Sequence, residues 1–226
     1  VNVVEGIQEI LKNASPERIQ ASFDRIMKCK EKTGILTATS SSTDTFDFEK
    51  TSYLNQKIAE NCITKIKDNH NTITLFDAKN RGKLAKLSLY KNTENSFFRS
   101  LSDVLPSPEF SYEAGEDLSL KEFEKELSDY DTLLVSLFVP KAKPLNNFDI
   151  EDSVLQLLAR LFATKKCILY VFGNPYALQS IPNLKDTRGI IQMYQDFTEF
   201  QETAAEQLLE NSPCKGTLPV KVNGIQ

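Results

Sequence analysis

The stretch Cys167–Leu178, "CILYVFGNPYAL", joins an apolar run to an abrupt turn. Its first six residues are apolar or aromatic without polar alternation, which is typical of a β-strand covered on both faces. Gly173, Asn174 and Pro175 end the run, because these residue types favour turns. A second run of this kind, "TLLVSLFV", occupies 132–139. Two such runs predict strands in the interior of a mostly parallel sheet.

Helical patterns separate the predicted strands. The clearest helix spans about 150–163, where apolar residues recur every three or four positions. Further helices are expected at about 97–105, 120–127 and 198–208. Further strands are expected in "CITKIKD" (62–68), "TITLF" (72–76), "KLAKLSLY" (83–90), "IIQMY" (190–194) and "TLPVKV" (217–222). Alternating strands and helices predict an α/β fold, a mostly parallel sheet with helices on both faces in a three-layer sandwich.

The first 36 residues differ from the rest in pattern. They contain two amphipathic helices, and Ser15–Pro16 is a typical start for the second. Their apolar stripes consist of Val3, Ile7, Ile10 and Leu11, and of Ile19, Phe23, Ile26 and Met27. Residues 37–50 are rich in Ser, Thr and Asp and predict a linker. We therefore expect a helical segment at 1–36, a linker at 37–50 and an α/β domain at 51–226.

Composition excludes several classes of function. The chain has 226 residues, 27 basic against 31 acidic, a net charge of −4, and no Lys/Arg stripe, so nucleic acid is not an expected partner. No apolar stretch reaches the roughly 20 residues of a membrane span. The four cysteines form no C-x-x-C pair and predict free, buried thiols. The chain starts with Val1, without a recognisable signal peptide, which suggests a piece of a longer protein.

The turn at Gly173–Pro175 is the main candidate for chemistry. Ligands gather at the carboxyl ends of parallel strands, so Asn174 and Tyr176 are candidate binding residues. The glycines match neither a dinucleotide nor a phosphate loop, and Pro175 removes a backbone donor, which favours a simple structural turn. The only histidine, His70, lies in a polar turn. We therefore predict no catalytic residue, no metal site and no cofactor.

Several of these segments, in this order, resemble the C-terminal α/β domain of family 3 glycoside hydrolases. The resemblance rests on the turn 173–178, Tyr194, the "AAE" of 204–206 and "GTLPV" at 216–220. Two earlier stretches extend it. "LNQKIAENCITKIKDNHNTITLF" (54–76) resembles the segment that opens this domain, and "ASPERIQASFDRIMKCKEKTGI" (14–35) resembles the last helices of a preceding (β/α)₈ barrel.

The resemblance implies a function shared with a second domain. Family 3 enzymes are retaining glycosidases whose aspartate nucleophile lies in the barrel, so this chain is expected to be a non-catalytic domain that partners a barrel and its carbohydrate substrate. Glucosidase-like members take their acid/base from a glutamate of the α/β domain, whereas β-N-acetylhexosaminidase-like members use an Asp-His pair of the barrel. The segment "PKAKPLNNF" (140–148) has no carboxylate, which favours the second branch. The resemblance also implies a bacterial periplasmic or extracellular location.

Two other functions remain open from the sequence. The chain could be a stand-alone carbohydrate- or small-ligand-binding module that uses Asn174 and Tyr176. An independent nucleotide-dependent enzyme is disfavoured by the lack of a phosphate loop. If the two N-terminal helices normally cover a barrel, their stripes within 3–27 should be poorly covered here, dock on the α/β domain, or pair with a second copy.

Overall fold

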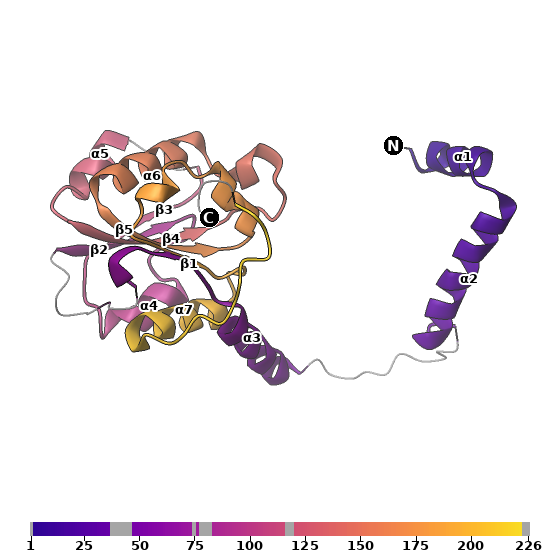
Figure 1. The fold of residues 1–226 in the computed structure, drawn as a ribbon, viewed down its shortest axis with the longest axis horizontal. Helices are drawn as coiled ribbons and strands as arrows, with labels where there is room; N and C mark the ends of the chain where they lie inside the picture. The colour runs from indigo at the N-terminus through magenta and orange to yellow at the C-terminus, as the bar shows by residue number, and fades with distance from the viewer. Residues whose placement is uncertain (1, 37–46, 74–75, 77–82, 116–119, 223–226) are drawn as a thin grey trace. The chain divides into compact units, whose positions relative to one another are not determined.

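The computed structural model describes residues 2–36, 47–73, 76, 83–115 and 120–222 (Figure 1). The chain forms two compact units, Val1–Phe46 and Asp47–Gln226. Helix α3 begins at Phe48, so residues 48–50 of the expected linker are helical. Residues 37–46 of that linker lie outside the described part. Among the described residues, no helix is both long and apolar enough to cross a bilayer.

The first unit contains two helices, α1 (Val3–Asn13) and α2 (Pro16–Lys32). Each starts at a side-chain cap, since Oδ1 of the Asn2 side chain accepts from the Val4 amide and the Ser15 hydroxyl accepts from the Arg18 amide. The sequence pattern therefore predicts both helices correctly. Neither helix contains a buried residue.

The second unit is built around one sheet. Its described strands are β1 (Thr64–Asp68), β2 (Leu84–Leu89), β3 (Glu109–Tyr112), β4 (Thr132–Phe138), β5 (Lys166–Phe172) and β6 (Gly189–Gln192). They lie in the order β1-β6-β5-β4-β2-β3. All neighbouring pairs are parallel except β1 with β6, which is antiparallel. The central pair runs in register from Thr132 beside Lys166 to Phe138 beside Phe172.

Helices cover both faces of this sheet. On one face lie α3 (Phe48–Cys62), α4 (Ser96–Ser102) and α7 (Thr198–Glu210), and on the other lie α5 (Leu120–Glu126) and α6 (Asp152–Thr164) (Figure 1). Alternate residues of β5 enter the two cores: Leu169 and Val171 face α6, whereas Tyr170 and Phe172 face α4 and α7. The arrangement confirms the predicted α/β fold with a mostly parallel sheet between two helical layers.

The connections leave the sheet in opposite directions at one point. The chain passes from β2 into α4 on one face, and from β4 into α6 on the other. Because β2 and β4 are neighbours, their carboxyl ends form a topological switch point, where open α/β sheets place ligands. The described part of the unit also contains four short 3-10 helices: η1 (Asn69–Asn71), η2 (Leu145–Asp149), η3 (Pro175–Ser180) and η4 (Leu184–Asp186).

Two predicted strands differ from the structure, and one observed strand was not predicted. The segment "TLPVKV" forms no strand, although Leu218, Val220 and Val222 pack against the core beside α6, and Pro219 cannot donate to a ladder. In "TITLF", Thr72 and Ile73 form a turn, Phe76 is irregular, and residues 74 and 75 lie outside the described part. Strand β3 was not predicted, because its four residues, "EFSY", are too few and too polar to show a pattern.

Candidate functional site: the carboxyl edge of the parallel strands

The parallel strands β2, β4, β5 and β6 end at one edge of the sheet, which we call the carboxyl edge. It consists of the residues that directly follow these strands, 90–92, 139–142, 173–176 and 194–196. The predicted binding residues Asn174 and Tyr176 lie there. His70 does not, because β1 is antiparallel to β6 and places the following η1 at the opposite edge.

The Gly173 turn is held by contacts within the chain. Gly173 has φ +131°, and a Cβ atom built on it would lie 2.7 Å from Cβ of Val139. The side chain of Asn174 donates to the Ala142 carbonyl at 2.9 Å and accepts from the Tyr176 amide at 2.9 Å, which caps η3. Asn174 therefore has a structural role in this arrangement. The ring of Tyr176 remains 48 % exposed at a hollow in the edge.

Two tyrosines at the carboxyl edge have a left-handed backbone, which is rare for bulky residues. Tyr90 follows β2 with φ 68°, and Tyr194 lies after β6 with φ 66°. Hydrogen bonds hold both rings: the Glu151 amide donates to the Tyr90 hydroxyl at 2.7 Å, and the Tyr194 hydroxyl lies 2.7 Å from Oγ1 of Thr64. Burial raises the pKa of Tyr90 to about 12 and also raises that of Tyr194. Both hydroxyls are therefore neutral at ordinary pH.

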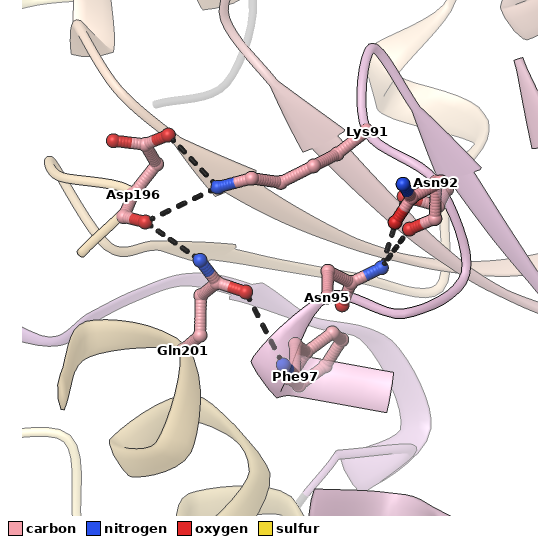
Figure 2. Close-up of polar contacts among 7 residues, drawn as sticks. Lys91, Asn92, Asn95, Phe97, Asp196 and Gln201 are labelled. Atoms are coloured by element: carbon pink, nitrogen blue, oxygen red, sulfur yellow. Dashed lines mark hydrogen bonds and ion pairs between the residues drawn. The ribbon is translucent and has the colours of Figure 1, made fainter. Parts of the chain in front are cut away.

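The residues after these tyrosines meet across the edge. Nζ of Lys91 lies 3.0 Å from Oδ2 of Asp196 (Figure 2). The same Nζ lies 4.8 Å from the ring centre of Phe138 at the end of β4. Lys91 and Asp196 are 105 positions apart in sequence. The side chain of Gln201 links Asp196 to the start of α4. It donates to the Asp196 carbonyl at 2.6 Å and accepts from the Phe97 amide at 3.3 Å.

The buried side-chain amide of Asn95 forms hydrogen bonds with the segment that follows Lys91. The side chain of Asn95 donates to the Asn92 carbonyl at 2.6 Å and to Oγ of Ser88 at 3.2 Å, and it accepts from the Phe98 amide at 2.9 Å (Figure 2). Asn95 thus caps α4 and fixes the turn that follows β2. These contacts make the surroundings of Lys91 a preorganised polar surface.

Two hollows lie along the carboxyl edge. The first, of about 660 Å³, lies around Lys91, Asn92 and the start of α7 at Phe197. The second, of about 480 Å³, lies between the Gly173 turn, Tyr176 and the segment 194–196. Asp196 lines both. The residues predicted from the sequence, Asn174 and Tyr176, line the second hollow, and no residue of the first hollow was predicted. One signal was present: "YKN" and "YQD", each a tyrosine with two polar residues, come directly after apolar runs.

The described residues hold no group of three or more His, Cys, Asp or Glu side chains that could bind a metal ion. All four cysteines are free, as predicted, but only Cys167 is fully buried, and Cys29 is exposed. Burial raises the pKa of the Cys167 thiol to about 12, which keeps it protonated. The arrangement at the edge therefore offers hydrogen bonds and aromatic surface.

No family model and no curated protein matches this sequence. Solved structures do match, over nearly the whole chain. The fold is that of part of the family 3 glycoside hydrolases. A family 3 β-N-acetylglucosaminidase from Paenibacillus sp. str. FPU-7 is 16 % identical with a TM-score of 0.62, and the match covers 92 % of this chain and 40 % of that protein.

Two further structures are similar in fold. A fungal multi-domain β-N-acetylglucosaminidase is 15 % identical with a TM-score of 0.62, covering 97 % of this chain and 25 % of that one. A β-glucoside phosphorylase, BglX, is 18 % identical with a TM-score of 0.64, covering 96 % and 41 %. The chain thus spans less than half the length of each of these three proteins. At these identities the likeness establishes the fold.

Proposed function

We propose that this chain is the non-catalytic α/β domain of a retaining glycoside hydrolase whose nucleophile lies in a separate (β/α)₈ barrel. One observation carries the proposal: structures of family 3 enzymes match 92–97 % of this chain, while the chain spans 25–41 % of theirs. The domain would pack beside the barrel and form part of the surroundings of the sugar. The substrate class would be β-N-acetylglucosaminides or β-glucosides.

The carboxyl edge supports a non-catalytic role. Retaining hydrolysis needs a nucleophilic carboxylate and an acid/base about 5–5.5 Å apart. Asp196 is paired with Lys91, and Oε1 of Glu199 accepts a hydrogen bond from Ser52 at 2.6 Å. Both carboxylates thus have partners within the chain, and the segment 140–148 adds no further carboxylate to this edge.

The test is an activity assay of the purified chain on nitrophenyl N-acetyl-β-glucosaminide and nitrophenyl β-glucoside. We expect no turnover above that of a mock purification. Turnover that disappears when one residue of the chain is replaced, for example in Asp196→Asn or Glu199→Gln, would show that the active site is here and would overturn the proposal.

We infer the sugar from the segment 140–148, which brings no carboxylate to the carboxyl edge. An acid/base supplied by the barrel is the β-N-acetylhexosaminidase-like arrangement, so N-acetylglucosaminides are the proposed substrates. A protein in which this chain is joined to a barrel should hydrolyse the N-acetylglucosaminide faster than the glucoside. The opposite preference would contradict this choice of sugar.

A second candidate function is a carbohydrate-binding module that works without a barrel. The two hollows at the carboxyl edge favour it, because ligand sites are concave and carry a few placed polar groups. Calorimetric titration of the chain with chitobiose, muropeptide-type sugars and nucleotides tests this module. If none of these ligands gives a heat of binding, the chain is not such a module. Binding of a nucleotide would instead support the third function, a nucleotide-dependent enzyme.

A further inference from the structure

The two hollows of the carboxyl edge have a common wall. Asp196 lines both of them, and its Oδ2 is paired with Lys91. Figure 2 shows Lys91 extended toward Asp196, with the second carboxylate oxygen turned away from the ammonium group. That oxygen stays available as a hydrogen-bond acceptor. A ligand that enters both hollows would pass directly over this pair.

Each hollow also has one aromatic side chain that is half exposed. Phe197 lines the first hollow and Tyr176 lines the second, and each is 48 % exposed. Most other aromatic rings of the α/β unit are buried or partly buried in its two cores. An exposed ring beside amide and carboxylate groups fits the apolar face of a sugar, whose hydroxyls then bond to the polar groups around it.

The charges of the first hollow narrow the class of ligand. Its lining contains three carboxylates, Glu94, Asp196 and Glu199, against the one ammonium group of Lys91. A phosphate or other anion would be repelled, although the start of α7 would otherwise attract it. A neutral molecule with many hydroxyls satisfies both the carboxylates, as acceptors, and Lys91, as donor.

We infer that the carboxyl edge binds a neutral oligosaccharide in two adjoining subsites, one at Phe197 and one at Tyr176, with Asp196 contacting the sugar units on both sides. The choice of carbohydrate rests on the function proposed above. The ion pair with Lys91 is a positioning contact: it holds the Asp196 carboxylate at the junction of the subsites. A disaccharide should therefore bind better than its monosaccharide.

The experiment follows the backbone amide signals of the full chain by NMR during titration with chitobiose, cellobiose and N-acetylglucosamine. Signals from both subsites, at Asn92 and Phe197 and at Gly173 and Tyr176, should shift together with a disaccharide. We expect a dissociation constant on the order of 1 mM, and binding of the monosaccharide that is about tenfold weaker. Phosphate ions serve as the anionic comparison and should leave these signals unchanged.

Three variants test the residues. Phe197→Leu, which keeps an apolar contact for Phe200, and Tyr176→Ala should each weaken disaccharide binding roughly fivefold or more. Tyr53→Ala removes a ring that is 62 % exposed but lines neither hollow, so its affinity should equal that of the unchanged chain.

Three results would overturn the inference: no shift at the edge with up to tens of millimolar disaccharide, shifts confined to one hollow, or an equal loss in the Tyr53 variant. These outcomes are independent of the proposed function. Absence of sugar binding leaves a non-catalytic domain in place, whereas hydrolysis by the purified chain would refute that role without affecting the two subsites.

Discussion

Helices α2 and α6 share one sequence pattern and have opposite surroundings. Both carry apolar residues every three or four positions, yet α6 buries five of them and α2 buries none. Phe162 on α6 is 2 % exposed, whereas Phe23 on α2 is 54 % exposed. Periodicity therefore predicts that a segment is helical and which face is apolar. It does not predict what covers that face.

The same contrast separates the two units of the chain. The α/β unit has a core on each face of its sheet, while the helices of the first unit present Val3, Ile7, Ile10 and Leu11 to solvent. Short helices without a packed face have little stability in water. The first unit should therefore gain most of its stability from a surface that covers it, and the predictions below test this difference.

The largest effect is expected from a matched pair of phenylalanine substitutions. Phe172 is fully buried, and its ring centre lies 4.7 Å from that of Phe138. Phe172→Ala should lower the free energy of unfolding by about 3–5 kcal/mol, whereas Phe23→Ala, measured at a concentration at which the chain is monomeric, should change it by less than about 0.5 kcal/mol. Urea denaturation measures both. A large loss in the Phe23 variant would show that the stripe of α2 is covered in solution.

The second-largest loss of stability is expected when glycines with positive φ are replaced by alanine. Gly173→Ala combines an unfavourable backbone with a contact of 2.7 Å to Val139, and should destabilise the α/β unit by about 2–4 kcal/mol. Gly34 has φ +74° with open space around it, so Gly34→Ala should cost about 1 kcal/mol at most. The melting temperatures of the two variants in thermal unfolding measure this difference. Equal melting temperatures would contradict the tight packing of the Gly173 turn.

Alkaline pH should destabilise the α/β unit selectively. Burial raises the pKa of Cys167 from 9.0 to about 12 and that of Tyr90 from 10.0 to about 12. The folded state thus holds protons that the unfolded state releases, so the free energy of unfolding is unchanged below about pH 9 and falls as pH rises toward about 12. Residues 1–46 contain no tyrosine, so phenolate absorbance reports on this unit alone.

The control for the alkaline experiment is Tyr53→Phe, which removes an exposed hydroxyl and should leave the unfolding curve in place. Tyr90→Phe should reduce the loss above pH 10. An α/β unit whose stability stayed constant to pH 12 would show that Cys167 and Tyr90 are not protected from solvent base.

The smallest effect on the α/β unit should come from removal of residues 1–36. Its unfolding free energy should change by less than about 0.5 kcal/mol, since Asp47–Gln226 form a compact unit with a core on each face of the sheet. The oligomeric state should change more. The exposed stripes within 3–27, at roughly 25 cal/mol per Å² of apolar area, are sufficient to pair two copies. Light scattering should detect a dimer only in the full chain, and a monomer in both would rule out this pairing.

Much of the α/β unit could be predicted from local patterns. The apolar runs at 132–139 and 167–172 became the two central strands, and the periodic stretch at 150–163 became α6. The turn at Gly173–Pro175 follows β5, where the sequence predicts the strand to end. Strand β2 was predicted as well, although it buries Lys86, which forms an ion pair with Glu109 at 2.5 Å on an unpredicted neighbouring strand.

Only half of the candidate site could be predicted from the sequence. Asn174 and Tyr176 were placed at the carboxyl edge because they follow a recognisable strand. Lys91 and Asp196 were not, because each looks like an ordinary polar loop residue until the order of β2, β4, β5 and β6 is known. Each also follows a tyrosine with a left-handed backbone, Tyr90 or Tyr194, and the sequence does not show that conformation.

The sequence by itself determined the helices, the central strands and the turns, because these depend on residues within a few positions of one another. The tertiary structure decided the antiparallel place of β1, the burial of the apolar face of α6, and the meeting of Lys91 with Asp196. Each of these depends on contacts between distant parts of the chain, and the free energy of such contacts comes from packing that has no local signature.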